Sequence, residues 1–538
     1  MKKTCLIFGI LILCAFSVKA QSEYQPYSYQ FYQKLNSVMY SPDTRMHTVI
    51  KPMFADDSLL KPRVDSLMNL GVNKNHKSWA LRKLFDEHLI NAGNKDYTFY
   101  ADYLPDLVIG KEFTSKKTTW INTRGFQAAL KIGSKFSFYT NLFENQAVFA
   151  PYLTSMIRKN PVIPGQAITS VPGRPEVKSF DYSYSTANLS YTPIKYINIS
   201  LAYDKNFIGD GYRSMLLSDF STNYTSFKLT GNLGNVQYMT MWTYMIDPLA
   251  PRTSTDRGTA DQYKYGVFQY LDWNISNRVS IGFFQSILWA KNNSDGTFRG
   301  FDDKYLNPII FLRPLESSDP NSPDKTHLGL TAKYKVFKNL TMYGQFLLDD
   351  FKASEFFKGS GYWANKYGIQ AGIKGFNAFG IKNLNYLAEY NEARPYTYSH
   401  FQEITSYSNA GLPLAHPFGG NFREYLTIWN YSYHRFDFMG QANYGIYGLD
   451  ENGIDYGKDL SISYLKHPND YGNYIGQGLY TKLVYLEGRV AFMLNPKYNL
   501  RIELGGIYRK ESNSQSVSKT NMLTIGLRSS FRNLYTDF

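Results

Sequence analysis

The sequence predicts an all-β fold: a transmembrane antiparallel β-barrel of about 18 strands, preceded by a small N-terminal α-helical region. Three observations support this prediction. Aromatic side chains make up 17% of the 538 residues, with 46 Tyr and 37 Phe, although only 43% of residues are hydrophobic. No segment after residue 20 is long and apolar enough for a membrane-spanning helix. Many segments of about ten residues alternate apolar and polar side chains, as the strands of such barrels do.

Residues 1–20 have the pattern of a secretory signal peptide. Lys2 and Lys3 form a basic start, and Cys5–Val18 is a short apolar core. The small residue Ala20 ends the segment as a cleavage site would. We therefore expect export through the inner membrane and, with the strand pattern, a place in the outer membrane.

Cleavage before Gln21 would change the chemistry of the mature chain. Both cysteines would leave, which excludes disulfides and cysteine metal sites. Loss of Lys2, Lys3 and Lys19 would lower the net charge from +14 to +11. This excess suits anionic neighbours such as lipopolysaccharide or an acidic surface polysaccharide, and no basic block indicates nucleic-acid binding.

Residues 21–117 differ from the rest and predict a helical or irregular region on the periplasmic side. Pro62 can begin one helix, and Gly71 can end it. Ser78 is a candidate N-cap for a second helix. One face of that helix would hold a stripe that we expect to be buried: Leu81, Leu84, Phe85, His88 and Leu89.

Residues 118–538 form the predicted barrel. In the run 196–204, Ile197 and Leu201 share one face, while Asn198 and Ser200 share the other. The apolar face would be the core of a soluble sandwich but the lipid-facing side of a barrel, and the period alone leaves both open. We count about 17 such runs. They begin near residues 118, 134, 180, 195, 225, 235, 263, 277, 327, 340, 366, 383, 424, 436, 479, 498 and 520.

The links between these runs favour the barrel. Short links such as 192–193 alternate with long ones such as 146–179 and 448–478, as expected for short turns on one rim and long loops on the other. Bacterial barrels have even strand numbers, so one more strand is expected, and we place it around Ser461–Leu465.

Catalytic signatures are absent from the sequence. It contains no zinc-protease, nucleophile-elbow or P-loop motif, and its eight histidines are scattered. Carboxylate pairs occur at 302–303 and 349–350, but a distance suited to glycoside hydrolysis is not encoded locally, and acids on lumen walls are more common. We expect a protein that is not an enzyme, with no cofactor and no metal.

A Gly-rich stretch, Gly209-Asp210-Gly211-Tyr212-Arg213, follows one of the strands. A dinucleotide-binding loop would need a buried parallel strand before it and a helix after it, and neither is present. The glycines instead favour a sharp bend in the connection 206–224, on the outer rim or folded into the lumen. Arg213 would then pair with a lumen carboxylate or with an acidic glycan, because a buried arginine needs an anion.

The same stretch carries a family resemblance. "GDGYRSMLLSDFS", "YLNPIIFLRPLE", "LTMYGQFLLDDF" and "LAHPFGGNFREYL" resemble the Wzi-type capsule assembly proteins of the outer membrane, Bacteroidetes branch. The stretch "SWALRKLFDEHLINAGNKDYTFYADYLPD" is similar to that of RemB-type gliding-motility proteins. The resemblance implies an 18-stranded barrel with a periplasmic helical bundle, which attaches or organises capsular polysaccharide without catalysis.

Three functions remain open from the sequence. The first is polysaccharide binding, in which loop aromatic rings stack on sugars and cations pair with acidic groups. Its candidate ligand-binding residues are Tyr212, Arg213, Arg394, Tyr396, Tyr398 and Arg423, with Tyr407 beside them. Each could equally be a lumen-packing or girdle residue. The second is a gliding-motility or adhesion role with motility or export machinery as partner, and the third, less favoured, is a diffusion porin.

Overall fold

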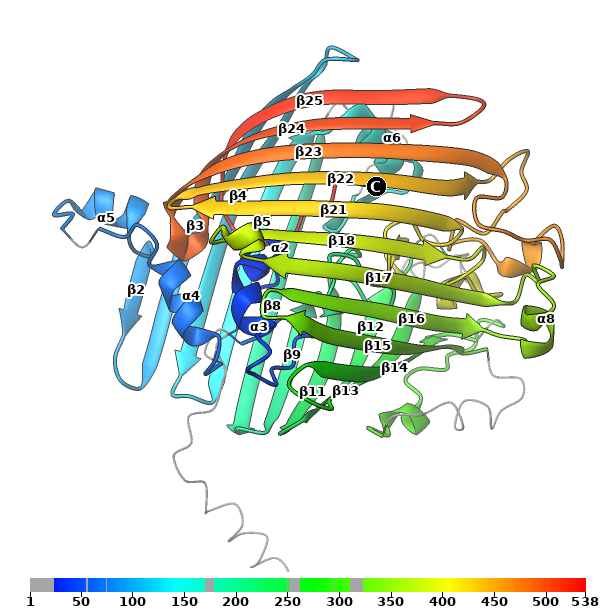
Figure 1. The fold of residues 1–538 in the computed structure, drawn as a ribbon, viewed down its shortest axis with the longest axis horizontal. Helices are drawn as coiled ribbons and strands as arrows, with labels where there is room; N and C mark the ends of the chain where they lie inside the picture. Colours follow the sequence, from blue (N-terminus) through cyan, green and yellow to red (C-terminus); the bar gives the residue numbers. More distant parts are fainter. Residues whose placement is uncertain are drawn as a thin grey trace, which may run out of the picture.

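The chain forms a closed barrel that surrounds several inserted segments (Figure 1). This computed structural model describes residues 24–54, 57–73, 75–169, 179–248, 250, 262–293, 295–309 and 323–538, so the predicted signal peptide lies outside the described residues. Eighteen strands pair antiparallel in chain order, and β25 closes the ring by pairing with β3. A nineteenth, β2, pairs only with β3 among the described strands. The predicted fold class is confirmed.

The barrel strands are β3 (Tyr97–Glu112), β4 (Thr118–Ile132), β5 (Phe136–Val148), β8 (Phe180–Ile194), β9 (Ile197–Asp204), β11 (Tyr224–Leu233), β12 (Val236–Ile246), β13 (Tyr263–Asn274), β14 (Val279–Ala290), β15 (Lys325–Phe337), β16 (Leu340–Asp350), β17 (Lys366–Phe376), β18 (Leu384–Ala393), β21 (Phe422–Tyr433), β22 (Phe436–Leu449), β23 (Leu479–Asn495), β24 (Leu500–Ser512) and β25 (Val517–Arg528). The short strands are β1 (Ile50–Lys51), β2 (Ile90–Gly93), β6 (Val162–Ile163), β7 (Ala167–Ile168), β10 (Phe207–Ile208), β19 (Ser408–Asn409) and β20 (Leu412–Pro413).

The α-helices are α2 (Tyr29–Tyr32), α3 (Asn36–Met39), α4 (Lys61–Met68), α5 (Trp79–Phe85), α6 (Pro151–Lys159) and α8 (Ala353–Phe357). The 3-10 helices are η1 (Gln33–Leu35), η2 (Asp303–Leu306), η3 (Ala378–Gly380), η4 (Glu403–Thr405), η5 (Tyr464–Lys466) and η6 (Pro496–Tyr498). None of the helices among the described residues is long and apolar enough to cross a bilayer.

The barrel wall is apolar outside and polar inside, which separates it from a soluble sandwich. On β9 the apolar Leu201 and Tyr203 are 51% and 45% exposed, whereas Asn198 and Ser200 are buried. Exposed apolar side chains alternating with buried polar ones are the pattern of a wall that faces lipid on one side and a lumen on the other.

The first barrel strand was placed wrongly by the sequence. Every predicted start lies within three residues of the start of an observed strand. The expected strand at Ser461–Leu465 is absent, because this segment is a turn that leads into η5. The missing strand is β3, inside the region predicted as helical or irregular. Pro105 explains the error, because proline argues against a central strand. On one edge of β3 it pairs with Arg124 of β4. On the other edge it lies between the part that pairs with β2 and the part that pairs with β25, where none of the described strands pairs with it.

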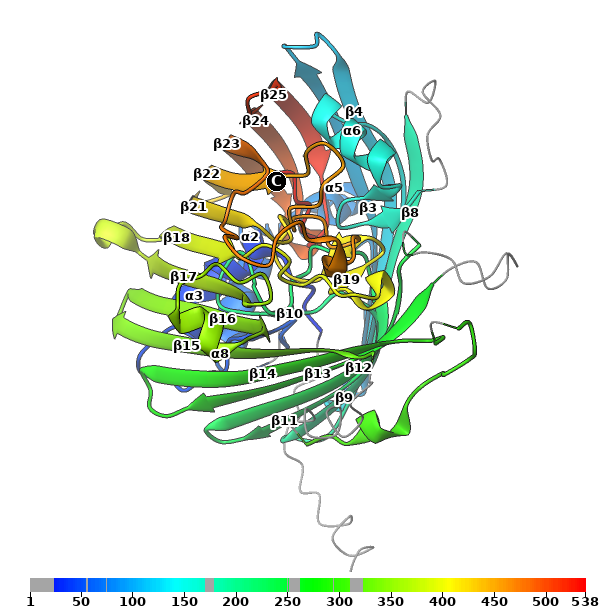
Figure 2. The ribbon, with the colours of Figure 1, turned by 90° about the vertical axis from the view of Figure 1, so that its right-hand side faces the viewer.

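The two rims differ as predicted. Turns such as 133–135, 234–235 and 434–435 close one end, along the left and lower edges of Figure 1, while the described parts of the long connections, 149–169 and 450–478, lie at the other. Seen from the long-loop rim, the connections fold over and into the ring of strands (Figure 2).

The N-terminal helices lie at the short-turn rim. Helix α4 begins beside Pro62, buries Val64 and ends before Gly71, as expected. The predicted buried stripe on the second helix is wrong, because α5 has only seven residues and buries none. It crosses the end of β23, where Asn495 donates to the Lys83 carbonyl, instead of packing in a bundle. His88 lies past this helix and packs on Tyr100.

Candidate functional site

The Gly-rich stretch lies inside the lumen and is buried by contacts with the barrel wall. The backbone N–H groups of Tyr212 and Arg213 donate to the Glu389 carboxylate of β18 at 2.6 and 3.2 Å. A Cβ on Gly211 would collide with the same carboxylate, so glycine permits this close approach. The stretch therefore fills the barrel rather than cradling a phosphate.

Asp210 holds this turn in a cluster of cations. Tyr40 and Thr48 donate to its carboxylate at 2.7 and 2.5 Å, and the Lys333 ammonium lies 3.7 Å away. Lys374 donates to the Asp210 carbonyl. Burial alone would raise the pKa of Asp210, but the neighbouring lysines lower it well below its usual range. The cluster connects the N-terminal segment, the loop and the wall.

Arg213 is paired with internal carboxylates. Its guanidinium binds Glu424 of β21 at 3.0 and 3.2 Å, and Asp537 at 2.9 Å, with all three side chains at most 2% exposed. Burial would lower the pKa of Arg213, but Asp537 and Glu424 raise it well above its ordinary value. Gln441 and Asn443 also donate to Asp537, which satisfies the second acid. The internal alternative for Arg213 is confirmed.

The other predicted residues are spread over the long-loop rim. Tyr398 is fully buried and donates to the Met215 carbonyl at 2.8 Å, and Tyr407 stacks on it. Tyr396 is also fully buried, with its hydroxyl 3.2 Å from the Asp455 carbonyl. These rings were expected to offer faces to a sugar, but they are used to pack the connection 394–421 into the lumen.

Two arginines and one tyrosine remain partly exposed. Arg394 is half-buried and donates to the carbonyls of Tyr362 and Asn473. Arg423 lies on the outer wall, 39% exposed, and pairs with Glu392 at 3.1 Å. Tyr212 packs against the ring of Tyr535 in the lumen. The structure does not bring the six predicted residues together into one site.

Residues 529–538, which we call the return segment, run back through the lumen from the short-turn rim. Phe531 packs on Phe31 near that rim, and Asp537 reaches Arg213. The Phe538 carbonyl accepts a hydrogen bond from Arg509 of β24 at 3.2 Å, near the long-loop rim. The segment therefore spans most of the barrel height.

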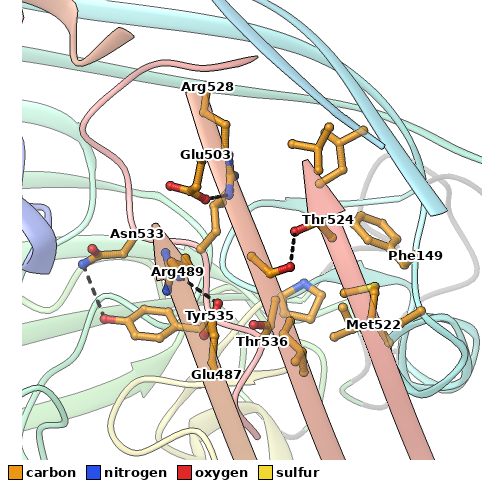
Figure 3. A pocket seen from close by; sticks show the side chains of 18 of the residues that line it. Phe149, Glu487, Arg489, Glu503, Met522, Thr524, Arg528, Asn533, Tyr535 and Thr536 are labelled. Carbon is orange, nitrogen blue, oxygen red and sulfur yellow. Dashed lines mark hydrogen bonds and ion pairs between the residues drawn. The ribbon is translucent and has the colours of Figure 1, made fainter. Parts of the chain in front are cut away.

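An inner cavity of about 180 Å³ lies beside the return segment (Figure 3). Asn533, Tyr535 and Thr536 line it opposite Phe149, and the walls of β23 and β24 supply charged side chains. Glu503 pairs with Arg528 at 2.9 Å. On β23, Glu487 lies 2.7 Å from Arg489. The charges of Arg489 and Arg528 are thus balanced by carboxylates of the wall, so we expect this cavity to bind anions weakly.

A larger cavity of about 620 Å³ lies at the long-loop rim, and we call it the rim cavity. It is lined by side chains from four distant parts of the chain: Tyr152, Lys159, Phe418, Tyr447, Lys458 and Arg509. The Arg509 guanidinium lies 4.5 Å from the centre of the Tyr152 ring, and the Lys458 ammonium 4.7 Å from that of Tyr447. Asp450, Asp459 and Glu511 balance the three cations.

Rings and balanced charges suit a polyhydroxylated ligand, since ring faces stack on sugars while ionic groups hydrogen-bond hydroxyls. Sequence reasoning missed this cavity. One local signal existed: Pro151 begins α6, an amphipathic helix within a long connection, which indicates an ordered rather than a loose loop. Among the described residues, no group of three or more His, Cys, Asp or Glu side chains could hold a metal ion.

Comparisons with known proteins identify the fold. No protein-family model and no curated protein match the sequence. Among solved structures, the chain is similar to Wzi of Escherichia coli, an outer membrane protein involved in group 1 capsule assembly and a carbohydrate-binding β-barrel, with 11% identity, a TM-score of 0.53, and coverage of 95% of this chain and 100% of that chain. It also matches OccK5 (OpdH) of Pseudomonas aeruginosa, with 10% identity, a TM-score of 0.42, and coverage of 80% and 97%. At these identities the likeness establishes the fold alone.

Proposed function

We propose that this protein is a non-enzymatic outer-membrane barrel that binds a surface polysaccharide in the rim cavity. The cavity carries the proposal, because it opens among the long loops and combines rings with balanced charges. The capsule-assembly family resembled by the sequence and the carbohydrate binding of the E. coli barrel support it. Because three acids offset three cations, recognition rests on hydroxyl groups and ring faces more than on net charge.

Filling the rim cavity tests this function. Ser518 lines the cavity and is exposed, so Ser518→Trp should occupy it without disturbing the core. We expect at least about a tenfold loss of affinity, or 1.4 kcal/mol, for capsular polysaccharide from the source cells, measured with purified protein. Ser514→Trp is the matched control, since Ser514 lies in the same hairpin but does not line the cavity. Equal binding by both variants would refute the assignment.

The proposal also predicts a pH effect. Burial lowers the pKa of Lys458 to about 8, while Asp459 opposes the shift. Lys458 is therefore charged below this pH and neutral above it, which leaves the rim cavity with net negative charge. Between pH 7 and pH 9, binding of an acidic polysaccharide should weaken relative to that of a neutral one. Parallel titrations of the two ligands measure the difference, and an unchanged ratio would contradict the role of Lys458.

Orientation in the membrane is a further part of the proposal. We place the short-turn rim, with α4 and α5, in the periplasm. Protease added to intact cells should therefore leave residues 58–92 uncut, whereas the same protease should cleave them after the outer membrane is opened. Cleavage in intact cells would show that the protein has the opposite orientation.

A deletion strain scored for both capsule retention and colony spreading separates polysaccharide binding from the motility alternative.

A further inference from the structure

Three lysines form a row on the outer wall, near the long-loop ends of adjacent strands. Lys482 of β23, Lys510 of β24 and Lys519 of β25 lie on the same faces as Leu486, Leu504 and Leu523, which are 45%, 54% and 54% exposed. Each lysine is an even number of positions from the leucine of its strand (four, six and four), so the lysines point outward as well. The row therefore lies directly above the lipid-facing apolar surface.

The pairing of these strands places like charges against each other. Lys510 is directly opposite Lys519, which brings their Cβ atoms to about 4.5–5.5 Å. Lys482 is opposite Ser512, and Ser512 is two residues along β24 from Lys510. Lys482 is therefore the diagonal neighbour of Lys510. Within the described part of the chain, none of the three has a carboxylate at ion-pair distance. Like charges directly opposite are destabilising, so a bound anion would relieve the repulsion.

A hollow lies in the outer wall below this row. It measures about 480 Å³ and is lined by Phe113, Leu486, Tyr508 and Leu523 beside the paired glycines 488 and 506. Gly440 continues the glycine row on β22, opposite Gly488. A Cβ at Gly440 or Gly488 would meet no atom within 4 Å, so the glycines leave a strip of wall uncovered.

The row and the hollow are spaced as the parts of one amphipathic ligand. Gly506 and Lys510 are four residues apart on β24, which corresponds to about 13 Å along the strand. An anionic head group at the lysines could thus continue into an acyl chain over the glycines. The long-loop rim is the outward side under the proposed orientation, so the ligand would belong to the outer leaflet.

We propose that this wall is a binding site for a phosphorylated, multiply acylated glycolipid of the outer leaflet. Its phosphates lie between Lys482, Lys510 and Lys519, and one acyl chain lies in the glycine hollow. This site is separate from the rim cavity, which lies on the lumen side of the same strands. Its loss would leave polysaccharide binding by the purified protein intact.

The test uses diphosphoryl lipid A as probe, with the full chain in detergent and native mass spectrometry as readout. Each lysine strengthens binding to an anionic membrane surface about fivefold, so changing all three to Ser should weaken binding about a hundredfold. Gly488→Leu fills the hollow and leaves every charge in place, and should also weaken binding several-fold. Lys195→Ser, Lys338→Ser and Lys382→Ser together are the matched control, since these lysines lie in the short turns.

The outcomes separate a lipid A site from a general anionic surface. Strong binding by the wild type and the control, with loss in both the lysine and the Gly488→Leu variants, supports the site. Phosphatidylglycerol should bind more weakly than lipid A in the wild type. Unchanged binding in the lysine variant, equal loss in the control, or equal affinity for phosphatidylglycerol would overturn it. Heat-modified mobility on gels verifies that each variant is folded.

Discussion

Replacement of Arg213 by alanine is expected to lower the free energy of unfolding by about 3–5 kcal/mol. The guanidinium is the cation that binds both Glu424 and Asp537, and all three side chains are buried. Among the described residues, its removal would leave Asp537 without a cation and Glu424 with only the buried His416 imidazole, 2.8 Å away, at a place that water hardly reaches. Either the acids take up protons or the return segment separates from the wall, and both cost free energy.

Urea unfolding, followed by heat-modified mobility on gels, measures the loss. Arg423→Ala is the control, because Arg423 also pairs with a glutamate but on the exposed outer wall, where such pairs contribute about 0–1 kcal/mol. A second variant, Arg213→Met with Glu424→Gln, removes one acid with the cation and should recover part of the stability. Equal stability of Arg213→Ala and Arg423→Ala would show that the lumen network does not hold the barrel.

The contrast between these two arginines shows how far the sequence could predict the site. A buried arginine needs an anion, and this rule correctly required a partner for Arg213. Whether that partner was a ligand or part of the chain depended on Glu424 and Asp537, which are 211 and 324 residues away. No local pattern encodes contacts at such separations. Tyr398 was misjudged for the same reason, since its place in a long loop did not reveal its burial.

The barrel itself was easier to predict, because strand period and link length are local properties. The alternation in 196–204 predicted β9, and only the burial of Asn198 against the exposure of Leu201 showed which face is outside. The first strand was missed because proline argues against a central strand. Only the paired strands show that Pro105 lies between the residues that pair with β2 and those that pair with β25. The rim cavity combines four distant segments, so it too required the folded chain.

Deletion of residues 531–538 is expected to convert a barrel with a blocked lumen into one that conducts ions. Three cavities follow one another along the wall of β22–β24: the rim cavity, the inner cavity, and a third of about 60 Å³ near the short-turn rim. The return segment lines all three, with Phe538 in the first, Tyr535 in the second and Phe531 in the third. Its removal would therefore join spaces that it now separates.

Planar bilayers measure the effect. The wild type should give no resolvable conductance steps, and the truncated chain should give discrete ones, because an uninterrupted water-filled path carries ions. A synthetic peptide with the sequence FRNLYTDF should then close the channel when added. Block by this peptide would also show that the conductance comes from a folded barrel, since a misfolded one would not be blocked specifically. A peptide with the same residues in scrambled order is the control.

The result decides between a plugged binding protein and a diffusion porin. Steps in the wild type equal to those of the truncated chain would show that the return segment leaves an open path, which favours the porin. If neither the wild type nor a folded truncated chain gives conductance steps, the N-terminal and loop segments suffice to close the lumen. The Arg213→Ala variant gives a second test in the same bilayers, with the full chain present. Because Asp537 would no longer bind Arg213, the return segment should leave the lumen more often, and brief conductance steps should become more frequent.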